Sequence, residues 1–246
     1  MKTPRDNFEK IFDGVNNVLV VLAHPDDMEI NCGGLMARLA ASKRALRLVV
    51  TTNGGKGTKE KFINEGQFAK TRIEEQIKAG EILGVPISEN FNLQIPDGGL
   101  ETIVKNIEKI AFHIRQFKPE LVITHNPEDA IIHFFDQSTW INHRDHKNTA
   151  QITIDAIYPY ARNTGFFPEH FSQHHLTTHS VKKLLLTDHY TKPEVRYFLI
   201  DKFLDKKKKA LQQHLSVFDL SDADDYIEEN KIGEQYFEPL GYYEVY

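Results

Sequence analysis

Hydrophobic and polar positions follow two alternating patterns along the chain. Short continuous apolar runs, such as residues 18–23, are typical of strands that are covered on both faces. Between them lie longer segments with the apolar periodicity of amphipathic helices. The expected strands are residues 18–23, 46–52, 91–95, 120–125, 181–186 and 195–200. The expected helices are residues 27–42, 67–83, 100–117 and 201–217, and the segment that follows His146 up to residue 161.

This alternation predicts an α/β layered fold in which helices flank a mostly parallel central sheet. Residues 1–246 contain no internal repeat, low-complexity tract or linker, so we expect a single domain. The two longest connections, residues 126–142 and 163–180, are of the kind that usually serves function. In such folds, sites form at the carboxyl ends of strands.

The composition narrows the function. The 246 residues carry a net charge of -5, which argues against binding nucleic acid through phosphate neutralisation. A single cysteine, Cys32, excludes an internal disulfide and is expected to be buried. Neither a signal peptide nor an apolar stretch approaching ~20 residues is present, so we expect no membrane span and a cytoplasmic location. The basic run 206–209 is expected to be a solvated helix face.

Candidate metal ligands follow the first expected strand. Residues 23–29 read AHPDDME, with His24, Asp26 and Asp27 in a strand-to-helix turn. Adjacent carboxylates repel each other unless positive charge lies nearby, and a divalent cation is the simplest source of it. The i, i+3 spacing lets His24 and Asp27 converge on one ion, which leaves Asp26 free to contact a water molecule bound to that ion. One of the two carboxylates is also explained by the helix dipole.

A second group, Asn142-His143-Arg144-Asp145-His146, follows a later strand through a long loop. Catalytic zinc commonly takes three protein ligands and keeps one position for water. His24, Asp27 and one histidine of this group reach that number. Spacing alone allows His146, His143 or even His125 as the third ligand.

Together, AHPDDME and the downstream HRDH resemble the LmbE/PIG-L family of zinc-dependent de-N-acylases, which act on N-acetylglucosamine derivatives and similar amides. Supporting similarities cover most of the chain: Arg72 and Glu75 after the second strand, the Asp97-Gly98 turn, the K-x-x-A-L-x-x-H-x-S pattern ending at Ser216, and the closing Tyr243-Glu244. The resemblance implies a Rossmann-like layered fold. The sequence departs from the family pattern at Arg144, where proline is common, and in the longer approach over residues 126–142, which puts the substrate in question.

The resemblance also implies roles for individual residues. His24, Asp27 and His146 would bind one zinc ion per chain, although iron is left open as the native metal. Asp26 would be the general base, His143 would stabilise the oxyanion and Asp145 would hold a neighbouring imidazole. Arg72 and Asp97 would contact the sugar, although a surface ion pair with Glu75 and a turn role, respectively, also explain them.

The function expected from these features is zinc-dependent removal of an N-acyl group, above all N-acetyl, from an amino-sugar derivative or similar small amide. Zinc lowers the pKa of bound water to about 7 and polarises the carbonyl. Alternatives are another metal-dependent hydrolase, such as a phosphoesterase, or a catalytically silent relative that binds a small molecule. Asp26 and His143 argue against the silent relative, because binding alone needs no general base. A homo-oligomer is left open.

Several further residues allow two interpretations. His125 ends an expected strand that faces the site, where it is either an outer partner of the ligands or a substitute ligand. His214 lies on an expected helix and is expected to be a packing residue. The histidines between residues 170 and 179 are expected to lie at a surface or pocket edge rather than to bind a second metal. Trp140, Phe134 and Phe135 either wall the pocket or anchor their loop.

Overall fold

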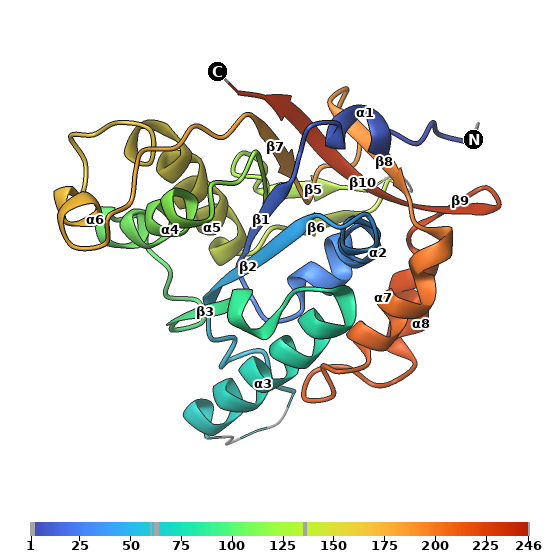
Figure 1. Ribbon diagram of the computed structural model, residues 1–246. Helices are drawn as coiled ribbons and strands as arrows, with labels where there is room; N and C mark the ends of the chain where they lie inside the picture. Colours follow the sequence, from blue (N-terminus) through green and yellow to red (C-terminus); the bar gives the residue numbers. More distant parts are fainter. Residues whose placement is uncertain (1–2, 60, 62–63, 135–136, 246) are drawn as a thin grey trace.

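The computed structural model of this chain describes residues 3–59, 61, 64–134 and 137–245. Its framework is an eight-stranded sheet with the strand order β3-β2-β1-β4-β7-β10-β8, to which β9 adds by pairing with β10 (Figure 1). The sheet consists of β1 (Asn17–Leu22), β2 (Ala45–Thr52), β3 (Asn90–Ile95), β4 (Leu121–Thr124), β7 (Lys183–Leu186), β8 (Val195–Leu199), β9 (Lys231–Ile232) and β10 (Gln235–Glu244). A separate hairpin is formed by β5 (Ile131–His133) and β6 (Thr139–Ile141).

The central strands are parallel. β1 pairs in parallel with β2 and β4, β2 with β3, and β4 with β7, whereas β10 runs antiparallel to both β7 and β8. The predicted α/β fold with a mostly parallel sheet is therefore confirmed. The long strand β10 was not predicted, because Pro239 and Gly241 interrupt its apolar pattern.

Helices cover both faces of this sheet. They are α1 (Phe8–Phe12), α2 (Asp27–Ala41), α3 (Glu65–Leu83), α4 (Val104–Phe117), α5 (Arg144–Asp155), α6 (Pro168–Ser172), α7 (Leu204–Leu211) and α8 (Asp222–Glu228), with 3-10 turns at Ile87–Glu89 and Asp201–Phe203 and a π-helical turn at Ala156–Tyr160. No helix in the described part of the chain is long and apolar enough to cross a membrane.

Side chains of β1 divide between two hydrophobic cores. Val18, Val20 and Leu22 point into the core shared with α1, α2, α3 and α7. Leu19 and Val21 point into the core shared with α4 and α5. A strand that is buried on both faces must be apolar at every position, which explains the continuous run that predicted it.

Two helices differ from the predicted ranges. The helix expected over residues 201–217 ends at Leu211, because the following turn brings Ser216 to α3, where its backbone N–H and hydroxyl donate to Glu75. α5 begins at Arg144 rather than after His146, and the His143 side chain caps it by accepting from the backbone N–H of Asp145. His146 therefore lies in the first turn of this helix.

Candidate metal centre

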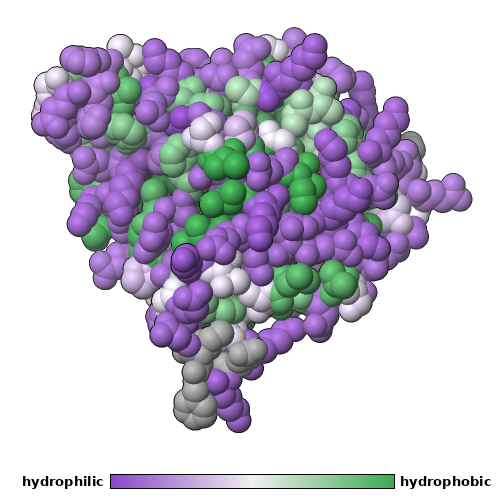
Figure 2. Space-filling view, turned by 60° about the horizontal axis from the view of Figure 1, so that its bottom comes forward, coloured by the Kyte–Doolittle hydropathy of each residue, from purple (hydrophilic) through white to green (hydrophobic). Residues whose placement is uncertain are grey.

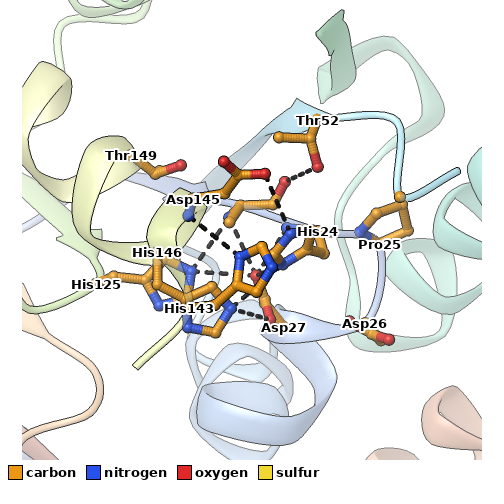
Figure 3. Close-up of polar contacts among 12 residues, drawn as sticks. His24, Pro25, Asp26, Asp27, Thr52, His125, His143, Asp145, His146 and Thr149 are labelled. Atoms are coloured by element: carbon orange, nitrogen blue, oxygen red, sulfur yellow. Dashed lines mark hydrogen bonds and ion pairs between the residues drawn. The ribbon is translucent and has the colours of Figure 1, made fainter. Parts of the chain in front are cut away.

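The predicted site residues gather at the carboxyl ends of β1 and β4. The chain leaves β1 to form β2 and β3 on one side, and β4 is then added on the other side of β1. The crevice at such a reversal of strand order is the usual ligand site of open α/β sheets. Figure 3 shows side chains from the turn after β1, from the end of β4 and from the start of α5 pointing toward one another in this crevice.

Potential ligand atoms of three residues, His24, Asp27 and His146, lie close together at the centre of the site, and we call these three residues the triangle. His24 Nδ1 lies 3.2 Å from His146 Nε2 and 3.5 Å from Asp27 Oδ2. His146 Nε2 lies 3.3 Å from Asp27 Oδ1. Tetrahedral zinc with bonds of ~2.0–2.2 Å separates its ligand atoms by ~3.3–3.6 Å. The donor set and its spacing therefore fit a zinc ion, and they bring together the three residues that the sequence predicted as ligands.

The electrostatics of the triangle favour a bound cation. Burial alone lowers the pKa of His146, but the carboxylates of Asp27 and Asp188 raise it to about 10. Burial alone raises the pKa of Asp27, but His146 and His125 hold it well below its usual range. A pocket that stabilises positive charge on an imidazole this strongly also stabilises a metal cation in the same place.

The other ring nitrogen of His24 faces two carboxylates. Its Nε2 lies 3.4 Å from Asp97 Oδ1 and 3.7 Å from Asp145 Oδ2. Asp145 in turn accepts backbone N–H bonds from Gly98 at 2.6 Å and Leu100 at 3.3 Å, which join the 98–100 loop to α5. Carboxylates of this kind fix the tautomer and orientation of metal-binding histidines. The sugar contact expected of Asp97 stays a prediction.

Asp188 and His125 form the opposite wall. Asp188 Oδ2 lies 2.8 Å from His125 Nδ1 and 3.6 Å from His146 Nδ1. The His125 ring stacks on that of His146 at 3.9 Å, and its Nε2 lies 3.1 Å from Asp27 Oδ2. His125 thus contacts two of the three triangle residues from outside. Asp188 was not predicted as a site residue, although it lies just after the predicted strand 181–186, at the end of the strand where the sites of open α/β sheets form.

Asp26 lies beside the triangle rather than in it, as Figure 3 shows. Its Oδ2 is 2.5 Å from Arg72 Nη2, and Arg72 also donates to the carbonyl groups of Pro25 and Gly54. A Cβ on Gly57 would lie 2.6 Å from Arg72 Nη1, so a glycine lets this loop close around the guanidinium. Burial raises the pKa of Asp26, and Arg72 opposes that shift. The sugar contact expected of Arg72 stays a prediction.

His143 presents one ring nitrogen to the site. Its Nδ1 accepts from the backbone N–H of Asp145 at 3.1 Å, so the neutral ring carries its proton on Nε2. The ring lies 4.6 Å from that of His24, edge to face. Burial, together with His24 and His146, lowers the pKa of His143. The residue is therefore a neutral hydrogen-bond donor beside the triangle.

The histidines of residues 170–179 do not form a comparable centre. Glu108, Glu169 and His170 approach one another closely enough to be considered as a metal site. However, Arg115 Nη1 lies 3.1 Å from His170 Nδ1, and a guanidinium can only donate. The His170 proton must then be on Nε2, which leaves that nitrogen no lone pair for a metal. His179 lies elsewhere, 2.7 Å from the carbonyl oxygen of Pro119.

A cavity of about 780 Å³ lies beside the first turn of α2. It is lined by Ile30 and Asn31, and Asn31 Nδ2 donates to the carbonyl oxygen of Asp27 at 2.9 Å. Its aromatic lining residues are Phe134, Tyr190, Tyr197, Tyr226 and Phe237. The space is large enough for a drug-sized ligand. We call it the aromatic chamber.

The loop before α5 supplies the rim of the site. Trp140 is 51% exposed, and its ring lies 6.2 Å from that of His146, so it covers the site rather than the core. Phe134 lines the aromatic chamber, whereas Phe135 lies outside the described residues.

Figure 2 shows hydrophobic side chains in the middle of the face it presents, surrounded by hydrophilic ones. Patches of this kind often mark places where ligands or partners bind.

Sequence comparison identifies a de-N-acetylase family and relatives that are named as deacetylases. A family model described as PIG-L: GlcNAc-PI de-N-acetylase matches residues 19–157. Diacetylchitobiose deacetylase of Thermococcus kodakarensis is 28% identical over 149 residues, which cover 59% of this chain and 51% of that protein. The 1D-myo-inositol 2-acetamido-2-deoxy-alpha-D-glucopyranoside deacetylase of Segniliparus rotundus is 30% identical over 168 residues, covering 56% of this chain and 49% of that protein. The chain spans about half the length of these two curated relatives.

The solved structures extend the likeness to nearly the whole chain. N,N'-diacetylchitobiose deacetylase from Pyrococcus horikoshii, in complex with an inhibitor, superposes with a TM-score of 0.80 over 96% of this chain and 86% of that chain. At 22% identity, this likeness shows a shared fold. Because it covers 96% of the chain, it includes most of the C-terminal part after residue 157, which the family model does not reach.

Proposed function

Because the chain belongs to the PIG-L family of GlcNAc-PI de-N-acetylases, we propose that it is a hydrolase that uses one zinc ion to remove an N-acyl group, above all N-acetyl, from an amino-sugar derivative or similar small amide. The observation that carries the proposal is the triangle of His24, Asp27 and His146, in which each imidazole nitrogen lies at a zinc-compatible distance from the other and from one of the two Asp27 oxygens. The two curated relatives, both named as deacetylases of acetylated sugars, support the choice of amide.

A zinc ion bound there would lower the pKa of a water molecule to about 7 and polarise the amide carbonyl. The protein orients the ligands for it. Asp97 and Asp145 hold His24 through Nε2, and Asp188 faces Nδ1 of His146. These carboxylates keep the facing nitrogens of the two imidazoles turned inward with their lone pairs available.

Asp26 is the proposed general base. Arg72 binds one of its oxygens, and 14% of the Asp26 side chain stays exposed, so the second oxygen can accept a proton from the attacking water. Burial raises the Asp26 pKa toward the working range of a base. The proton then passes to the leaving nitrogen as the amide C–N bond breaks, which yields a carboxylic acid and a free amine.

His143 is the proposed oxyanion donor. Its Nδ1 caps α5, so its neutral Nε2–H can donate to the carbonyl oxygen as negative charge develops there. A fixed donor of this kind commonly contributes a large share of catalysis in acyl transfer. This role differs from that of an imidazolium, because the surroundings of His143 lower its pKa.

The aromatic chamber is the proposed site for the part of the substrate beyond the reacting amide. Charges of the centre act on two tyrosines of this chamber. Burial and then Asp26 raise the pKa of Tyr226, and burial and then Asp188 raise the pKa of Tyr190. Aromatic faces flanked by Asn31 and Glu229 suit a sugar ring, which offers C–H faces to stack and hydroxyl groups to bind.

The test combines metal analysis with an amine-release assay on a panel of N-acetylated amino sugars and of phosphate esters. We expect one zinc per chain and release of amine. Asp26→Asn should keep its zinc but lose turnover by ~10²-fold or more, because general-base catalysis is worth that much. The exposed Asp205→Asn is the matched control and should behave as the wild type.

Three results would contradict parts of this proposal. Full activity of Asp26→Asn would remove Asp26 as the base. Full zinc content in His146→Ala would require a new ligand set with His125 or His143. Phosphate release without amine release would make the protein a phosphoesterase.

A further inference from the structure

Helix α2 is interrupted at Cys32, whose φ of -148° and ψ of 20° are not helical. In a regular helix, the N–H of Gly34 would donate to the carbonyl oxygen of Ile30, four residues earlier. In this structure it donates to a side chain, Glu238 Oε1, at 2.8 Å. The carbonyl oxygen of Ile30 accepts from Lys207 Nζ at 2.9 Å. A lysine and a glutamate thus bind the two backbone groups that a regular helix would pair with each other.

These two side chains form a buried ion pair. Lys207 Nζ lies 2.8 Å from Glu238 Oε1, and both residues are 0% exposed. The ammonium also donates to Asn230 Oδ1 at 2.6 Å, and Glu238 Oε2 accepts from the N–H of Leu35 at 2.6 Å. All three protons of the ammonium and both carboxylate oxygens therefore have partners. Complete pairing of this kind is what makes two buried charges tolerable.

The neighbouring elements pack closely around this ion pair. Lys207 lies on α7, which packs on α2, and Glu238 lies on β10 (Figure 1). A Cβ on Gly34 would lie 2.7 Å from Cβ of Ile200, so the absence of a side chain lets the chain approach the helix at the break. The interruption is thus built from residues of three distant parts of the sequence.

The segment before the break carries the metal-binding turn. Residues 27–31 are far too few to hold a helical shape by themselves. Their first residue is Asp27, and their fourth is Ile30, the partner of Lys207. Since the helix is interrupted at Cys32 and the backbone on either side of the break binds Lys207 and Glu238, we expect the orientation of this segment to depend on these two residues as well as on the site.

We infer that Lys207 and Glu238 are positioning residues for the metal centre, which hold Asp27 within reach of His24 and His146 by binding the carbonyl oxygen of Ile30 and the N–H of Gly34 at the break in α2. The inference rests on the proposed function, because it takes Asp27 as a zinc ligand. A pair that only stabilises the fold would have a different consequence: its replacement by apolar residues of similar volume would leave the metal centre intact.

The test compares Lys207→Met, the double variant Lys207→Met/Glu238→Met and the control Lys208→Met, whose lysine is partly exposed and pairs with Asp224. Zinc affinity is measured by competition with a chromogenic chelator, and stability by urea unfolding. Cys32 is the chain's only cysteine and is buried at the break, so its rate of reaction with a thiol reagent reports local opening. Neither zinc affinity nor thiol reactivity requires turnover.

We expect zinc affinity to fall ~10-fold or more in both Lys207 variants, the usual effect of losing an outer support of a metal site. Cys32 should react at least ~10-fold faster in both, because opening at the break exposes it. The double variant should regain stability relative to Lys207→Met, because it leaves no unpaired buried charge. Lys208→Met should match the wild type in all three measurements.

A double variant that binds zinc like the wild type, with Cys32 still protected, would overturn the inference. So would failure of both Lys207 variants to fold, because the pair would then serve the fold rather than the metal centre. If the wild-type chain binds zinc but hydrolyses no amide, the proposed function fails and this inference stands. If it binds no zinc, both fail.

Discussion

We expect His113 to make the scaffold sensitive to acid, independently of the candidate metal centre. It lies on α4 and is 8% exposed, with Nδ1 3.4 Å from Arg47 Nη1 and its ring 4.7 Å from that of Phe91. Burial and the Arg47 guanidinium lower its pKa from 6.5 to about 4. His113 therefore binds a proton less readily in the folded protein than in the unfolded chain.

The size of this effect follows from the two pKa values. Because the folded pKa is the lower one, stability is lost as the pH falls below the unfolded value and levels off below the folded value. Linkage predicts that His113 alone reduces the free energy of unfolding by ~2 kcal/mol between pH ~7.5 and pH ~5. This is a large part of the total stability of an ordinary domain.

The assay is urea unfolding of the metal-free wild type and His113→Gln at both pH values. Glutamine does not titrate but still offers Arg47 an acceptor. Other titrating groups cancel in the difference between the two proteins, so this difference should change by ~2 kcal/mol in favour of the variant on acidification. An unchanged difference would refute the reasoning. A change of the expected size would allow acid unfolding to be separated from titration of the site in pH–rate profiles.

Two further predictions concern the site itself. Asp188→Asn should weaken zinc binding by ~10–100-fold in chelator competition, because the neutral amide supports His146 and His125 less well; affinity equal to that of Asp205→Asn would exclude a supporting role for Asp188. Tyr226→Ala should raise the KM for a disaccharide substrate by ~10-fold and leave zinc content unchanged, because it removes one wall of the aromatic chamber; an unchanged KM would show that the substrate lies elsewhere.

The central sheet could be predicted because its strands are buried on both faces. In β1, every position from Val18 to Leu22 is buried, so the continuous apolar run has only one good explanation in an alternating α/β pattern. β10 follows a different rule. It lies among the last residues of the chain and pairs antiparallel with β7 and β8. Its Pro239 and Gly241 lower the strand signal, and only the neighbouring strands supply the partners that hold it in place.

The turn after β1 could also be predicted, since His24 and Asp27, two of the three predicted ligands, lie within four consecutive residues. The supports of that turn were not. Lys207 and Glu238 are separated from it by most of the chain, and each looks like an ordinary surface charge in the sequence. Lys207 sits in a run of four lysines that predicted a solvated helix face. One member of that run is fully buried, and only its position on α7 against α2 distinguishes it from its neighbours.

The choice between His143 and His146 shows why local spacing could not complete the site. Both histidines follow the same loop, and either can supply a third ligand by distance along the chain. The decisive feature is the start of α5 at Arg144, which makes His143 the capping residue and places His146 in the first turn. Capping engages Nδ1 of His143, whereas His146 Nε2 faces His24 and Asp27. A helix boundary is therefore what separates the proposed oxyanion donor from the proposed ligand, and boundaries are the least predictable part of a helix because they depend on contacts such as that of Asp145 with the 98–100 loop.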